Sequence, residues 1–206
     1  MKFAGIASAA AIAITGVFAA TGISTTPAHA LDANCGVGKS VDDVSYREAH
    51  DVYLCLERKM FDGYNTGDKK WVNANHVGQY RTWDAASTLP ANPGVHSNRF
   101  LFTYVNPIGS AAYRQFAEGV TMPVGTVIAK ESFTINSKGN AKPGPIFFME
   151  KVAAGTSPKT HDWYYTMVNP NGAPAAINVF KACNECHSGF AESDFLGYPD
   201  EDVRRR

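Results

Sequence analysis

The sequence predicts an α+β fold, a mainly antiparallel β-sheet with flanking helices. Four segments rich in aromatic and β-branched residues are typical of strands: 99–105, 126–135, 146–152 and 162–168. The last two have the spacing of consecutive antiparallel neighbours. Before these strands, apolar residues are spaced as on one face of a helix. A second segment with helical character follows the strands near the C-terminus.

Residues 1–30 have the pattern of a signal peptide. Lys2 supplies a positive charge, residues 3–18 are almost all apolar, and Ala28 to Ala30 offers the small residues that a signal peptidase recognises. The alternative is an uncleaved membrane anchor, but the apolar run is interrupted and short for a span of about 20 residues. We therefore expect export to the periplasm and a mature chain of 206 − 30 = 176 residues.

The charge balance narrows the range of partners. Without Lys2 the chain has 19 − 1 = 18 basic residues against 19 acidic residues, a formal net charge of −1. This balance argues against nucleic acid as a partner. No later segment is apolar enough to cross a bilayer, so we expect no membrane span after signal cleavage.

The first part of the mature chain is predicted to be helical. A helix is expected over 41–61, with Asp42 or Asp43 as its N-cap and apolar residues near one face. The polar stretch 62–78 contains glycine and asparagine and is predicted as a loop. Residues 80–86 are interpreted as the start of a second short helix.

Two cysteines lie in this first part. Cys35 precedes the predicted helix and Cys55 lies on it. A disulfide between them is the natural use of such a pair in an exported protein. The alternative is two free thiols.

Between and after the strands the sequence predicts two further helices and a loop. Asn106 and Pro107 suit an N-cap followed by a first helical residue, which predicts a helix to about Glu118. Residues 138–145 are predicted as a glycine- and proline-rich loop. The segment 175–187 is predicted as a helix that presents the motif described next.

The most specific signal is Cys-x-x-Cys-His, formed by Cys183, Cys186 and His187. Two thiols at this spacing can bond to the two vinyl groups of one haem c, and the adjacent histidine can bind its iron. A thioredoxin-like pair would follow a strand at a helix start, a zinc site would need two further ligands, and a disulfide bridges poorly at this spacing within a helix. Since the motif occurs once, one covalent haem is expected.

The order of several further motifs resembles the cytochrome P-460 family, which includes the related cytochromes c′-beta. The resemblance covers about residues 80–198. Its pieces are Tyr80 to Trp83, Phe102 to Pro107, Pro123 to Glu131, Phe148 to Lys151, Asp162 with Trp163, and Cys183 to His187 followed by Asp194.

This resemblance divides the mature chain into an N-terminal helical extension, 31–78, and a haem domain, 79–206. It implies a mainly antiparallel sheet, often a homodimer, with His187 as the proximal iron ligand. P-460 members carry a lysine cross-linked to the porphyrin and oxidise hydroxylamine, whereas c′-beta members lack the cross-link and bind gases such as nitric oxide. Lys130 stands at the cross-linking position.

Lys130 also stands out on physical grounds. A lysine in the middle of a strand is costly to bury without a partner, so a covalent or haem-facing role would explain it. The alternative is a solvent-facing lysine, or an ion pair with a carboxylate such as Glu150. Against the enzyme, the carboxylate that the resemblance implies for hydroxylamine oxidation falls near Thr156, where no acid occurs.

The sequence leaves the group on the distal side of the iron open. A His/Met electron carrier would use a methionine, and another distal residue would be a histidine; the candidates are Met122, Met149, Met167, His76, His96 and His161. His96, in a short loop before a strand, is the preferred distal histidine. The methionines of the strands suit a core role.

We therefore expect a periplasmic monohaem c-type cytochrome of the P-460 type. It would bind a small nitrogen oxide or diatomic ligand at the iron and exchange electrons with a redox partner such as another cytochrome. The first alternative is a hydroxylamine-oxidising enzyme with haem cross-linked to Lys130, and the second is a His/Met electron-transfer cytochrome.

Overall fold

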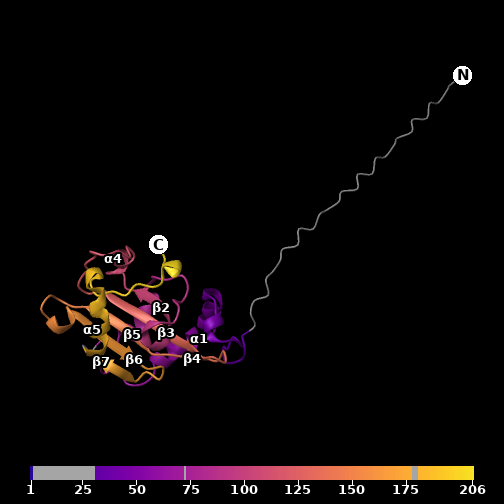
Figure 1. Cartoon of the computed structure of the whole chain (residues 1–206), viewed down its shortest axis with the longest axis horizontal. Helices are drawn as coiled ribbons and strands as arrows, with labels where there is room; N and C mark the ends of the chain where they lie inside the picture. The colour runs from indigo at the N-terminus through magenta and orange to yellow at the C-terminus, as the bar shows by residue number, and fades with distance from the viewer. Residues whose placement is uncertain (2–30, 72, 178–180) are drawn as a thin grey trace.

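The computed structural model describes Met1 and residues 31–71, 73–177 and 181–206 (Figure 1). Its centre is one seven-stranded sheet, in the order β1-β2-β3-β5-β6-β7, with β4 beside β3 and every pair antiparallel. The strands are β1 Asp84–Ala85, β2 Phe100–Val105, β3 Val127–Ile135, β4 Ala141–Pro143, β5 Ile146–Lys151, β6 Trp163–Val168 and β7 Pro174–Ile177. The predicted fold class is confirmed.

The helices are few and mostly short. The α-helices are α1 Tyr46–Tyr64, α2 His76–Gln79, α3 Val95–Asn98, α4 Ser110–Tyr113 and α5 Lys181–His187. The 3-10 helices are η1 Val41–Asp43, η2 Tyr80–Thr82, η3 Pro158–Thr160, η4 Ser188–Ser193 and η5 Glu201–Val203.

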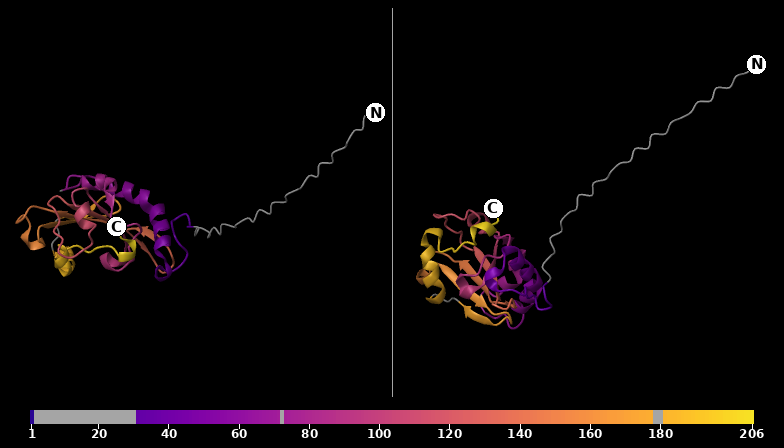
Figure 2. Two further views of the ribbon diagram at one scale, coloured as in Figure 1. Left: turned by 90° about the horizontal axis from the view of Figure 1, so that it is seen from above. Right: turned by 45° about the vertical axis from the view of Figure 1, so that its right-hand side comes forward.

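Strand β3 is the centre of the molecule. All its residues except Thr134 are buried, so both of its faces are covered. Helix α1 covers one face, and the C-terminal segment that includes α5 lies on the other, as Figure 2 shows from above. Two apolar clusters result, one on each side of the sheet. Because side chains alternate along a strand, Lys130 and Glu131 belong to opposite sides.

Glu131 ties the α1 side of the sheet together. Its fully buried carboxylate accepts hydrogen bonds from Tyr53 at 2.5 Å, from Tyr80 at 2.5 Å and from Arg81 Nη2 at 2.6 Å. Burial raises the pKa of this carboxyl. A buried charge is tolerated where several donors surround it, so Glu131 anchors α1 and η2 on β3.

The first long helix begins later than predicted. Ser45 is its N-cap, since its side chain accepts from the Glu48 amide while the Glu48 carboxylate accepts from the Ser45 amide. This capping box satisfies two helix-terminal donors. The prediction that Asp42 or Asp43 is the N-cap of this helix was therefore wrong. Those residues form η1, and Val44 is extended between the two helices.

Cys35 and Cys55 form a disulfide in the structure. It ties the start of the described chain to α1, while residues of α1 and of the sheet share one apolar cluster. The described residues of this N-terminal part therefore contribute to the same core as the strands.

Three other local predictions were wrong in whole or in part. The segment after Pro107 contains only α4, because Phe116 adopts a left-handed φ of 47° that ends the helical turns. The loop 138–145 contains β4, which pairs with β3. The predicted helix 175–187 holds for α5, Lys181–His187, but the first three residues of the prediction belong to strand β7.

A fourth prediction held in part. Residues 80–86 do begin with a helical turn, η2, but the chain then extends into β1. The signal-peptide prediction falls on residues outside the described ranges. In the described part of the chain, no helix is both long and apolar enough to span a membrane.

Candidate haem site

Helix α5 presents the Cys-x-x-Cys-His motif on the face of the sheet opposite α1. Cys183 is half-buried, Cys186 is exposed, and both are free thiols. Cys183 packs against the apolar cluster of this face, and burial raises the pKa of its thiol. The two cysteines can therefore bond to another group, since they are not joined to each other.

His187 is held in a defined orientation. It is buried, and its Nδ1 donates a hydrogen bond to the carbonyl oxygen of Phe195, 2.7 Å away. A carbonyl can only accept, so the proton is on Nδ1 and the lone pair of Nε2 is available to a metal. Burial and the charge of Lys130 lower the pKa of His187 to about 4, which keeps the ring neutral.

Asp194 secures the turn that follows the motif. Its carboxylate accepts from Lys151 Nζ at 2.7 Å and from the Met122 amide at 2.8 Å, and its carbonyl accepts from Trp163 Nε1 at 3.0 Å. The neighbouring Phe195 ring stacks on His161 with centroids 3.9 Å apart. The carbonyl that accepts the His187 hydrogen bond therefore belongs to a segment that is fixed to the sheet.

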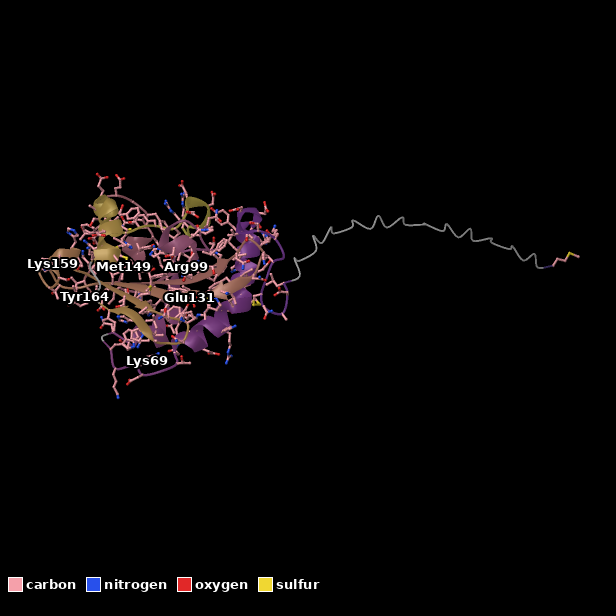
Figure 3. All side chains as sticks on the ribbon, turned by 60° about the horizontal axis from the view of Figure 1, so that its bottom comes forward. Lys69, Arg99, Glu131, Met149, Lys159 and Tyr164 are labelled. Atoms are coloured by element: carbon pink, nitrogen blue, oxygen red, sulfur yellow. A yellow bond between two sulfur atoms is a disulfide. The ribbon has the colours of Figure 1, made fainter. Side chains whose placement is uncertain are left out.

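The sheet contributes two rows of side chains to this site. Directly paired residues share a face, and one row is Thr103, Lys130, Phe147 and Met167. The next row contains Ile128, Met149 and Tyr165, and the Tyr165 ring lies 5.1 Å from that of His187. In Figure 3, Met149 lies near the C-terminal helices and Glu131 lies toward α1.

Lys130 is buried on this face, with 8% of its surface exposed. Its Nζ donates to the carbonyl of Gly197 at 2.7 Å, and burial lowers its pKa to about 8. The alternative prediction, an ion pair between Lys130 and Glu150, was wrong, because Glu150 points to the α1 side. There it accepts from Asn73 and lies 3.3 Å from Nε2 of His76.

His96 also reaches this site. Its ring centroid lies 4.7 Å from Phe147 and 6.2 Å from His187. Burial and the charge of Lys130 lower its pKa to about 3. His96, Lys130 and His187, which are far apart in sequence, are thus brought together.

The other distal candidates, except Met167, lie elsewhere or are committed to packing. His76 is on the α1 side, beside Glu150. His161 stacks on Phe195, while Met122 and Met149 are buried in the apolar cluster. Met167 is partly buried in the row that contains Lys130.

Among the described residues, the buried carboxylates are those of Glu48 and Glu131, and both lie on the α1 side. Thr156, at the position that the resemblance assigns to an acid, is on an exposed turn between β5 and β6. Glu131 and Glu150 face the α1 side, and the Asp194 carboxylate is occupied by Lys151.

The residues present fit a haem. Two free thiols and a neutral histidine with an available Nε2 supply attachment and an iron ligand. Aromatic and apolar residues of the sheet supply the lining. The Tyr165 hydroxyl and Nδ1 of His96 are buried without hydrogen-bond partners among the described residues, which is expected where a bound group completes a site.

In this structure, a helix presents two thiols and a neutral histidine toward the apolar face of a sheet. This arrangement is that of a haem-binding protein. The comparisons name the class more closely: the family model described as cytochrome P-460 matches residues 77–196, more than half of the chain. The chain therefore belongs to the cytochrome P-460 family, whose members are haem cytochromes. A search of curated proteins found no match.

Sequence reasoning missed the contacts that orient the motif. The Phe195 carbonyl gives no signal in the sequence, because any residue offers a carbonyl. Tyr165 and Phe147 could have been found, since register and alternation place them in the rows of Ile128 and Lys130.

Proposed function

We propose that this protein is an exported, periplasmic monohaem c-type cytochrome that binds a small diatomic or nitrogen-oxide ligand at its iron. Cys183 and Cys186 would attach the haem, and His187 would be its proximal ligand. When bound, the haem supplies the iron at which ligands bind and electrons are exchanged. The signal-peptide pattern of residues 1–30 supports export.

The observation that carries this proposal is the orientation of His187. His187 lies on α5, the helix that also carries both free thiols. Its Nδ1–H donates to the carbonyl oxygen of Phe195 at 2.7 Å. An outer hydrogen bond of this kind fixes the tautomer and the ring of a metal-binding histidine.

The role in ligand binding rests on the surroundings. Tyr165 and Met149 are buried and Phe147 is half-buried on this side of the sheet, and the buried carboxylates of the described residues, Glu48 and Glu131, lie on the other side. A site without a buried carboxylate as proton acceptor favours reversible binding over oxidation of a substrate such as hydroxylamine.

The attachment is tested by haem staining on a denaturing gel, with the protein produced in a periplasm that has haem c maturation. Cys183→Ala with Cys186→Ala should abolish the stained band. The matched control is Cys35→Ala with Cys55→Ala, which removes the other cysteine pair and should keep the stain. A band that survives loss of Cys183 and Cys186 would disprove the attachment.

A second candidate function follows from Lys130. A buried amine with a lowered pKa, near the rings of both His96 and His187, is suited to bond to a porphyrin. Such a cross-link would place the protein among the hydroxylamine-oxidising members of the family.

The optical spectrum of the reduced protein separates the two candidates. A cross-linked haem absorbs far to the red of ordinary haem c, and Lys130→Ala should then restore the ordinary spectrum and remove hydroxylamine oxidation. If the wild type already has an ordinary haem c spectrum and Lys130→Ala leaves it unchanged, the ligand-binding function stands and the enzyme is rejected.

A further inference from the structure

Two histidine rings on this side of the sheet lie at a separation that suits a shared metal. The ring centroids of His96 and His187 lie 6.2 Å apart, with an angle of 61° between their planes. Metal–imidazole bonds are about 2 Å long, so two imidazoles on opposite sides of one metal have ring centres about 6 Å apart. Rings in direct edge-to-face contact lie roughly 4.5–7 Å apart, so the unpartnered Nδ1 of His96 is the observation that distinguishes a ligand from a packing contact.

We propose that His96 binds the haem iron opposite His187 in the resting protein, and that an incoming small ligand displaces it. This inference rests on the haem attachment proposed above and deepens it, because it assigns the sixth ligand and the step that opens the site.

The His96 ring is prepared for such a role. Its Nδ1 is shielded from solvent and has no hydrogen-bond partner among the described residues. Contact with Phe147 at 4.7 Å orients the ring. A neutral imidazole has one ring nitrogen without a proton, and the lone pair of that nitrogen can bind a metal.

Other candidates for the sixth position fit less well. The amine of Lys130 donates to the Gly197 carbonyl, and Met149 lies within the apolar cluster. Tyr165 lies too close: its ring centroid is 5.1 Å from His187, whereas a tyrosine bound across the metal would have its ring farther away than a histidine would.

The backbone that carries His96 explains why the ligand can be released. His96, Ser97 and Asn98 have φ values of 55°, 60° and 57°, three consecutive left-handed residues that are not glycine. Left-handed backbone is unfavourable for such residues and persists only when the surroundings impose it. Arg99 Nη1 holds the turn through the carbonyls of His96 at 2.9 Å and Ser97 at 3.2 Å.

Release of His96 would let this turn relax. The exchange is simple in its balance: the bond from the His96 nitrogen to the iron breaks, the ligand's donor atom bonds in its place, and the neutral imidazole keeps its electron pair. Neither an oxidant nor a reductant is consumed. Ser97 and Asn98 are exposed, so the turn can move outward without unpacking the core.

Magnetic circular dichroism and electron paramagnetic resonance of the ferric wild-type protein test the proposal first. Two neutral imidazole ligands should give a low-spin signal with a charge-transfer band typical of His/His coordination. His96→Ala should become high-spin while the haem stays covalently attached, and added imidazole should restore the low-spin signal. His76→Ala, a histidine on the other side of the sheet, should remain low-spin.

Carbon monoxide binding to the reduced protein tests the displacement. The rate in wild type should level off at high carbon monoxide, because release of His96 becomes limiting, whereas His96→Ala should bind in proportion to concentration. A high-spin wild type, or a low-spin signal of amine or thioether type, would overturn the assignment even if His96→Ala fails to fold. In either case the covalent haem would stand, whereas loss of haem staining would instead refute the proposed function.

Discussion

Nδ1 of His187 donates a hydrogen bond to the carbonyl oxygen of Phe195, 2.7 Å away. The two residues lie on opposite sides of η4, and the chain turns between them through left-handed φ values at Asp194 and Phe195. This turn lets the backbone fold back under the histidine. The orientation of the proposed iron ligand therefore depends on the segment after the motif as much as on the motif itself.

Asp194→Ala should destabilise the protein by about 1–3 kcal/mol, because it leaves the buried amide of Met122 without its acceptor and Lys151 without its ion pair. Denaturant unfolding at neutral pH measures the loss. Asp202→Ala, at an exposed position in η5, should change stability by less than about 0.5 kcal/mol. Equal effects of the two substitutions would show that Asp194 does not secure the turn.

Glu131→Ala should cost about 3–5 kcal/mol, since it leaves Arg81 without its buried partner and removes the acceptor of Tyr53 and Tyr80. The matched control is Glu57→Ala, which removes the half-exposed carboxylate 3.9 Å from the same arginine and should cost about 0–1 kcal/mol. Haem attachment should survive at permissive temperature, because Glu131 faces away from α5. Loss of attachment in a folded Glu131→Ala protein would contradict the two-sided sheet.

Removal of the disulfide by Cys35→Ser with Cys55→Ser should destabilise by roughly 3 kcal/mol, because the bridge closes a loop across a sequence separation of 20 residues. Urea unfolding of the variant and the wild type measures the difference. Peptide mapping without reductant should also show the two cysteine peptides linked. Ready alkylation of both thiols in the native protein would be inconsistent with the bridge.

Glu48 should make stability fall in acid. The ion pair with Lys39 at 2.7 Å, together with the Ser45 hydrogen bonds, lowers the pKa of Glu48 to about 2 from an ordinary 4.5. A carboxyl with a lowered folded pKa stabilises fully above its ordinary pKa and loses this contribution as the pH falls toward the folded value. The gap in melting temperature between wild type and Glu48→Gln should therefore shrink between about pH 4.5 and pH 2, and a gap independent of pH would rule out the ionic contribution.

The strands and the haem motif were predictable because their signals are local. Aromatic and β-branched runs gave β2, β3, β5 and β6 within a residue or two. The helix starts were less accurate, since Asp42, Asp43 and Ser45 are all good N-caps and only the reciprocal Ser45–Glu48 pair decides among them. Strand β7 was taken for helix because Ala175 and Ala176 are strong helix formers, and pairing with β6 overrides that local preference.

The assembly of the site could not be predicted in the same way. Which face of β3 meets the motif depends on long-range packing of α1, and alternation alone leaves Lys130 and Glu131 equivalent. The structure separates them: Lys130 is placed beside His96 and His187, while Glu131 binds Tyr53. His96 reaches His187 only through a left-handed turn that the sequence Val-His-Ser-Asn does not signal.

The most direct test of the central claim is mass spectrometry of the tryptic peptide that spans residues 182–204, from protein produced with haem c maturation and then denatured. We predict that this peptide carries the mass of one haem and that neither Cys183 nor Cys186 reacts with an alkylating agent. Recovery of the same peptide without haem, with both thiols alkylated, would contradict the proposed attachment and with it the function of the site.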